Sequence, residues 1–224
     1  MRFRLLLLCG SVLACAAQVP AAVQANTAVQ SIASDSLARV HLADLAKVAP
    51  AIRLELRYAT ANNFTGVPLP GYEVARGLLR AEAARALARV QQRLESQGYG
   101  LKVWDGYRPV RATLAMVAWT ERNRRTDLLD DGYIARRSRH NQGVAVDLTL
   151  ISAGTGEELD MGTPFDEFSK RSHTAQASGA VARHRALLVQ AMAAEGFVNY
   201  ESEWWHFSFP VDNPMPFDLP LDRW

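Results

Sequence analysis

The sequence predicts an α+β fold, with a single domain in which helices flank an antiparallel sheet. Apolar and charged residues alternate over 52–58, and apolar residues recur at every second position over 144–150, as in strands with one apolar face. Between these segments, 73–97 carries apolar residues at helical spacing. Strands and helices are interspersed without regular βαβ units, and no internal repeat or linker indicates a second domain. One α+β domain is therefore expected.

Residues 1–25 have the layout of a secretory signal peptide. Arg2 and Arg4 form a basic start, 5–17 is an apolar run, and 23–25 supplies small residues for cleavage. An apolar run of about 13 residues is too short to span a membrane comfortably. We therefore predict a periplasmic or secreted protein with no transmembrane span after cleavage.

A lipoprotein anchor at Cys15 is the alternative, because 12–15 resembles a lipid-attachment box, although Leu13 stands where a small residue is usual. Both cysteines, Cys9 and Cys15, lie in this leader, so cleavage after Ala25 leaves neither disulfides nor thiolate metal ligands. Cleavage also takes Lys+Arg from 25 to 23, against 23 Asp+Glu, and this balance gives no indication of nucleic acid as a partner.

The remaining segments complete the predicted domain in chain order. Residues 26–42 contain few large apolar groups and are expected to form a flexible leader to a domain over 43–224. Asn and Gly residues predict a loop at 61–71, and Gly98 ends the long helix. The expected elements after it are a strand at 100–104, a turn at 105–109, a helix at 110–122, a charged loop at 122–137, the strand at 144–150, a long loop at 152–178, a helix at 180–195, strands at 197–200 and 204–209, and an extended surface tail after Pro210.

His140, Asp147 and His206 have the composition of a catalytic zinc site. Asp147 projects from the less apolar face of the strand at 144–150, and Gly143 lets the backbone turn between His140 and that strand. His206 arrives much later in the chain. Two imidazoles and a carboxylate leave a fourth zinc position open for water, which is the arrangement of a metallopeptidase.

Glu203 and Arg108 are the candidate catalytic residues. Metal-assisted peptide hydrolysis needs a base that takes a proton from water and returns it to the leaving amine, and Glu203 can do both. In a regular strand Glu203 and His206 would face opposite ways, so Glu203 is expected before the strand or at a bulge. Arg108, in a turn, is suited to stabilising an oxyanion. A carboxylate at the rim and a surface ion pair are the alternatives for these two residues.

Six motifs occur in order along the chain: Arg57-Tyr-Ala-Thr with Asn63-Phe-Thr-Gly66, Trp104-Asp-Gly-Tyr-Arg-Pro109, Ser138-x-His-x-x-Gly-x-Ala-x-Asp147, Met161-Gly-Thr-x-Phe-Asp166, Arg171-Ser-His173 and Glu203-Trp-Trp-His206. In these motifs the chain resembles the zinc D-alanyl-D-alanine dipeptidases, the family that includes the vancomycin-resistance dipeptidase. The resemblance extends over about 54–217. It implies a small α+β domain around an antiparallel sheet, shared with carboxypeptidases that trim peptidoglycan stems.

The resemblance also implies roles for named residues. One Zn²⁺ per chain would be held by His140, Asp147 and His206, with Glu203 as general base and acid and Arg108 as stabiliser of the tetrahedral intermediate. Residues that would line a small closed substrate pocket are Tyr58, Ser138 and Asp166. Asp166 would pair with the ammonium group of a free dipeptide, so the expected reaction is hydrolysis of D-Ala-D-Ala to two D-alanines.

Export is a departure from the cytoplasmic resistance enzyme, and it favours a role in degrading D-Ala-D-Ala released during cell-wall turnover. A D,D-carboxypeptidase acting on longer stem peptides is the nearest alternative function. A non-catalytic cell-wall binding module with a structural zinc is the other, although such a site is normally closed by a fourth protein ligand. The sequence predicts no oligomeric state.

Overall fold

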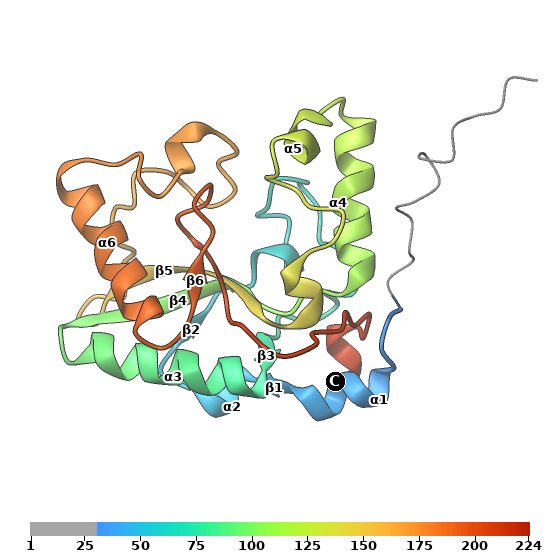
Figure 1. The fold of residues 1–224 in the computed structure, drawn as a ribbon, viewed down its shortest axis with the longest axis horizontal. Helices are drawn as coiled ribbons and strands as arrows, with labels where there is room; N and C mark the ends of the chain where they lie inside the picture. The colour runs from blue at the N-terminus through green and yellow to red at the C-terminus, as the bar shows by residue number, and fades with distance from the viewer. Residues whose placement is uncertain (1–30) are drawn as a thin grey trace, which may run out of the picture. The chain divides into compact units, whose positions relative to one another are not determined.

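The computed structural model describes residues 31–224, so the predicted signal peptide and the alternative anchor at Cys15 lie outside the described residues. Residues 31–224 form one unit in which helices and strands are interspersed (Figure 1). The elements are α1 (Asp35–His41), β1 (Leu42–Asp44), α2 (Leu45–Val48), β2 (Arg53–Leu54), β3 (Leu78–Arg80), α3 (Ala81–Glu95), β4 (Tyr99–Asp105), α4 (Val110–Arg122), α5 (Asp127–Asp130), β5 (Ala145–Ser152), α6 (Gly179–Ala193), β6 (Val198–Asn199) and β7 (His206–Ser208), with 3₁₀ turns η2 (Arg57–Ala59), η3 (Arg139–Gln142), η4 (Lys170–Ser172) and η5 (Leu221–Arg223).

The main sheet has five strands in the order β2-β4-β5-β7-β6. Its pairs are antiparallel except at the edge, where β2 runs parallel to β4. A separate two-stranded sheet joins β1 to β3. The α+β class and the largely antiparallel sheet that the sequence predicted are confirmed, and the parallel edge strand is an addition to that prediction.

Helices α3 and α6 cover one face of the main sheet. Leu87 of α3 and Leu188 of α6 are fully buried in the same apolar cluster as Val103 of β4 and Leu148 of β5. The opposite face of β5 carries Ala145, Asp147 and Thr149 and is the less apolar face, as expected. Every residue of β5 except the last is buried, because the loops over 57–66 and 152–178 pass across that face. The buried polar face carries the candidate site.

The predicted strand over 52–58 and helix over 73–97 were both too long. The strand ends at Leu54, and the chain then turns through η2, which carries Tyr58 inward to 2% exposure. The helix begins only at Ala81, because Leu78 and the two residues after it pair with β1. Hydrogen bonding to another strand decided the conformation there, whereas the apolar spacing alone indicated a helix.

The expected flexible leader at 26–42 and surface tail after Pro210 also differ from the structure. Within the described part of the leader, Ser34 caps α1 by accepting a hydrogen bond from the backbone of Leu37, and Ala38 is fully buried. In the tail, the alternate residues Phe217 and Leu219 are fully buried in a second apolar cluster. The C-terminus lies beside α1 (Figure 1). None of the helices within residues 31–224 combines the length and apolar character that crossing a membrane requires.

Candidate metal and substrate site

Strand register places three polar residues side by side on the covered face of the sheet. Asp147 of β5 pairs with His206 of β7 on one side and with Asp105 of β4 on the other. The β4–β5 register shifts between Val103 and Asp105, so Trp104 is the extra residue of a bulge. Directly opposed residues point to the same face of a sheet. The register therefore brings the carboxylates of Asp105 and Asp147 and the imidazole of His206 together on one face of the sheet.

His140 reaches the same spot from the short turn η3. Ser138 caps this turn by accepting a hydrogen bond from the backbone of His140, and Asn141 completes a capping box. Gly143 ends the turn with a φ of 69°, which glycine adopts without the steric penalty other residues meet. The Nδ1 of His140 lies 2.7 Å from the carbonyl oxygen of Gly106. Because a carbonyl only accepts, Nδ1 carries the proton and Nε2 presents its lone pair.

His140, Asp147 and His206 converge closely enough to hold one metal ion, with ligand atoms all within 4.8 Å of one another. His140 Nε2 lies 3.1 Å from His206 Nδ1 and 3.3 Å from an Asp147 oxygen, and His206 Nδ1 lies 2.9 Å from the other Asp147 oxygen. Tetrahedral zinc with bonds of about 2.0–2.1 Å separates its ligand atoms by about 3.3 Å. The donor set and its spacing therefore fit zinc.

Burial and mutual contact shift the pKa values of the ligands towards the forms that bind a metal. Burial raises the pKa of Asp147, but the neighbouring His140 and His206 outweigh burial and bring the pKa well below its ordinary value. Burial lowers the pKa of His206 more than Asp147 raises it. An ionised carboxylate and a neutral ring are the forms that coordinate zinc.

Asp105 holds the guanidinium of Arg108 in place. From the sequence, Asp105 was predicted to lie in a turn and was given no role in the site. The Nη2 of Arg108 lies 2.8 Å from Asp105 and 3.7 Å from Asp147, and its guanidinium carbon lies 4.9 Å from the centre of the Tyr58 ring. Arg108 is 8% exposed. Burial alone would lower the pKa of Arg108, but Asp105, Tyr58, Tyr72 and Asp147 together outweigh burial and raise this pKa, so the guanidinium stays charged.

Glu203 lies in the turn before β7. This position agrees with the prediction that Glu203 stands before the strand, from where it can face the same way as His206. The Oε2 of Glu203 lies 3.9 Å from His206 Nδ1, and the residue is 7% exposed. Burial raises the pKa of Glu203 well above its ordinary value, and the charges of Asp147 and Asp166 raise it further against the effect of Arg108. A carboxyl whose pKa is raised in this way can both accept and return a proton near neutral pH.

Asp166 lies in the loop between β5 and α6 and lines the same cavity as the metal-ligand candidates. Its φ of 61° is left-handed, a conformation that Asp adopts more readily than most residues. The Tyr58 hydroxyl lies 3.1 Å and 3.2 Å from its two carboxylate oxygens. Burial and the charge of Asp147 raise the pKa of Asp166 to about 8. A carboxyl held in this state gains from a cation that comes to lie beside it.

Arg185 of α6 anchors the loop that carries Asp166. It is 2% exposed, and its guanidinium lies over the ring of Trp204. Its nitrogens donate hydrogen bonds of 2.8–3.4 Å to four backbone carbonyls, those of Met161, Arg171, His173 and Gln176. One side chain thus ties together the loop segments before and after Asp166. This role could not be predicted from the sequence, where Arg185 is one of several polar residues on a helix.

All the predicted site residues meet around one cavity of about 380 Å³: Tyr58, Arg108, Ser138, His140, Asp147, Asp166, Glu203 and His206. Their individual roles stay predictions. Aromatic residues that the sequence did not single out complete the wall, namely Phe64, Tyr133, Phe168, Tyr200 and Trp205. The family motifs include some of them, but only the packed structure shows that they face the cavity.

A family model described as D-ala-D-ala dipeptidase, Peptidase_M15, matches residues 38–218. The D-alanyl-D-alanine dipeptidase of Enterococcus faecium is 39% identical over 196 residues, which cover 79% of this chain and 96% of that protein. The D-alanyl-D-alanine dipeptidase of Escherichia coli (strain K12) is 39% identical over 177 residues, covering 78% and 88%. The solved structure of the LdcB LD-carboxypeptidase is a more distant likeness, with a TM-score of 0.43 at 21% identity over 65% of this chain and 69% of that chain. The resemblance predicted from the motifs is thereby confirmed, and the chain belongs to the D-alanyl-D-alanine dipeptidase family.

Proposed function

We propose that this chain is an exported zinc dipeptidase that hydrolyses D-Ala-D-Ala to two D-alanines. The observation that carries the proposal is the convergence, in one small cavity, of a metal-ligand set, a carboxylate base, a buried guanidinium and a second carboxyl. The relatives named above are D-alanyl-D-alanine dipeptidases, and the chain covers most of their length. Each part of the cavity has a task in the hydrolysis of a free dipeptide.

His140, Asp147 and His206 would hold one zinc ion per chain. The donor chemistry and the spacing of the ligand atoms support zinc, and the hydrogen bond from His140 to the Gly106 carbonyl fixes the ring that would bind it. Zinc, when bound, supplies Lewis acidity that polarises a carbonyl and lowers the pKa of a coordinated water to about 7.

Glu203 would act first as the general base and then as the general acid. As the water oxygen bonds to the scissile carbonyl carbon, Glu203 takes one proton from that water. Its raised pKa favours holding the proton until the carbon–nitrogen bond breaks, when Glu203 delivers it to the departing amine. The second proton of the water stays on the new carboxyl group and then passes to the freed amine. The products are one D-alanine with a new carboxylate and one with a new ammonium group, so atoms and protons balance.

Arg108 would stabilise the negative charge that develops on the scissile carbonyl oxygen. Asp105 holds its guanidinium in place before the substrate arrives, so little reorganisation is needed during the reaction. Removing one such donor from an enzyme typically lowers the rate by about 10² to 10³.

Tyr58 and Asp166 would bind the ammonium group of the dipeptide, with Ser138 at the cavity wall. A longer peptide has a neutral amide in place of that ammonium group and would gain no ion pair with Asp166. This argument favours a dipeptidase over a D,D-carboxypeptidase. Three side chains within residues 31–224 converge as metal ligands, and a three-ligand site beside Glu203 and Arg108 favours an enzyme over a zinc-containing binding module.

Export belongs to the same proposal and rests on the composition of residues 1–25. A periplasmic or secreted dipeptidase would degrade D-Ala-D-Ala released during wall turnover. Fractionation of cells that express the full chain tests this location. Recovery of the protein in the cytosol at full length would contradict it.

The experiment that tests the activity is D-alanine release by the zinc-loaded protein, offered D-Ala-D-Ala and acetyl-D-Ala-D-Ala side by side. Cleavage of the free dipeptide alone is expected. Preference for the acetylated substrate would support the carboxypeptidase alternative and remove the ammonium-binding role of Asp166. Failure to cleave either substrate, with zinc bound, would favour the binding module.

A further inference from the structure

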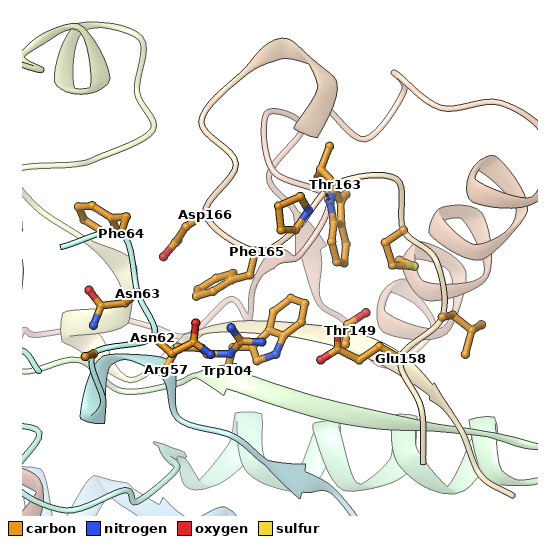
Figure 2. Close-up of a pocket in the computed structure, with 15 residues that line it drawn as sticks. Arg57, Asn62, Asn63, Phe64, Trp104, Thr149, Glu158, Thr163, Phe165 and Asp166 are labelled. Carbon is orange, nitrogen blue, oxygen red and sulfur yellow. Dashed lines mark hydrogen bonds between the residues drawn. The ribbon is translucent and has the colours of Figure 1, made fainter. Parts of the chain in front are cut away.

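A second cavity has a volume of about 340 Å³, and Figure 2 shows the residues that line it. The two cavities share Phe64 and Asp166 as lining residues. The second cavity also contacts Trp104 of β4 and Thr149 of β5. Thr149 lies two positions after Asp147 on the same strand, so both face the same side of the sheet. The second cavity is therefore a neighbour of the metal site along the same sheet face.

The ring of Phe165 stands between the two cavities. Phe165 lines the second cavity, where its ring centre lies 4.9 Å from that of Trp104. On its other side its ring centre lies 5.9 Å from that of Tyr58 and 5.7 Å from that of Trp205, and both of these rings line the substrate cavity. The main chain after Phe165 takes the left-handed turn at Asp166. The rings of Phe165, Tyr58 and Trp205 thus separate the two cavities.

Two residues that line the second cavity each hold a buried polar atom that the fold itself does not pair. Trp104 is 2% exposed and Thr149 is 1% exposed, yet the indole Nε1 of the first and the hydroxyl of the second have no hydrogen-bond partner within residues 31–224. Buried polar atoms are normally paired. Arg57 and Asn62 add further donors to the lining. A peptide group carries both a carbonyl acceptor and an N–H donor, so these residues match the chemistry of a peptide.

We propose that Phe165 determines the length of substrate that this enzyme accepts. Its ring packs behind Tyr58 and Trp205, which line the substrate cavity, and the second cavity has the size and polarity to hold the residue that precedes D-Ala-D-Ala in a longer peptide. The inference rests on the proposed function, because Asp166 marks the amino end of the dipeptide only if it binds the ammonium group. Replacing the ring of Phe165 by a smaller side chain would join the two cavities and admit an extended peptide.

The test is the ratio of kcat/KM for glycyl-D-Ala-D-Ala to kcat/KM for D-Ala-D-Ala, measured as D-alanine release by zinc-loaded protein. Phe165→Ala should raise this ratio at least about tenfold, which is the order of discrimination that removing a steric wall supplies. Phe165→Val should raise it less. The Val variant removes less of the ring and keeps the inference testable if the Ala variant does not fold.

Leu159→Ala is the matched control, because Leu159 lines the second cavity but packs only against the apolar cluster of Val103 and Leu148, whereas Phe165 packs against that cluster and also against the one that holds Tyr58. It enlarges the second cavity without joining it to the substrate cavity, and it should leave the ratio at the wild-type value. Phe165 variants that bind zinc and cleave the dipeptide without a rise in the ratio would overturn the inference while the proposed function stands. A wild-type enzyme that cleaves neither peptide would refute the proposed function and the inference with it.

Discussion

The hydroxyl of Tyr58 lies 3.1 Å and 3.2 Å from the two carboxylate oxygens of Asp166, across 108 positions of the chain. The one hydroxyl of Tyr58 donates from between the two oxygens. The remaining lone pairs of the Asp166 carboxylate can therefore accept from a substrate cation or another donor. The same Tyr58 ring lies against the guanidinium of Arg108. Tyr58 therefore connects the residue proposed to bind the amino end of the substrate with the residue proposed to act on its carbonyl.

Tyr58→Phe should raise KM for D-Ala-D-Ala about tenfold and change kcat little. The variant keeps the ring beneath Arg108 and removes only the hydrogen bond to Asp166. Hydrogen bonds to charged groups contribute about 1.5–3 kcal/mol, which corresponds to a loss of this size in affinity. Steady-state kinetics give the result. A fall in kcat at constant KM would place Tyr58 in the transition state instead.

The pH dependence of kcat/KM should reflect Asp166, whose pKa is raised to about 8. The substrate ammonium group pairs with the ionised carboxylate, so activity should increase as the pH rises through about 8 and this carboxyl loses its proton. The ammonium group of the dipeptide, with a pKa of about 8, limits the rise on the alkaline side. In Asp166→Asn the acidic limb attributed to Asp166 should disappear and kcat/KM should fall. An unchanged acidic limb in this variant would assign it to another group.

Glu203→Gln should retain zinc and lose about 10²- to 10⁴-fold in kcat, because the amide cannot take up the proton. Glu203 is not among the residues that converge as metal ligands, and its oxygen lies 3.9 Å from His206 Nδ1. Metal analysis and kinetics on the same preparation measure both quantities. Normal turnover with full zinc content would remove Glu203 from the mechanism.

His206→Ala should lower the zinc content of the purified protein, since a site with two remaining ligands binds zinc far more weakly. His184→Ala is the control, because the ring of His184 contacts the carbonyl of Asp160 and lies outside the cavity. The control should keep its zinc. Full occupancy in His206→Ala, measured by metal analysis after dialysis, would contradict the ligand assignment.

Arg185→Lys should weaken dipeptide binding without loss of zinc. Lysine keeps the positive charge but cannot donate to carbonyls as widely spaced as those that Arg185 joins. The loop carrying Asp166 then loses its anchor, so KM should rise more than kcat falls. Arg183→Lys, at an exposed position of the same helix, is the control. A lower unfolding temperature with unchanged KM would show that Arg185 supports only the fold.

The structure brings together the three residues that the sequence proposed as metal ligands, His140, Asp147 and His206, and their role stays a prediction. The need to place Glu203 outside the strand followed from strand geometry alone, and the turn before β7 satisfies it. Side-chain chemistry at fixed spacing is local information, and a single sequence carries it well.

Features that depend on partners distant in the chain could not be predicted. Asp105 faces the site because of a bulge at Trp104, and a bulge is visible only once two strands are paired. The segment at Leu78 is a strand because β1 lies beside it, although its apolar spacing is helical. The tail at Phe217 is buried because the second apolar cluster has room for it. In each case tertiary contacts outweighed the local pattern.

The pairing of β5 with β7 also sets the order in which the site can be built. His140 and Asp147 leave the ribosome close together, but His206 follows Asp147 by 59 positions and reaches it only when the two strands have joined. A chain in which β5 and β7 have not paired would offer the proposed metal ion two ligands, and the finished sheet would offer three. The ion would therefore bind an unfinished or misfolded chain far more weakly than the folded protein.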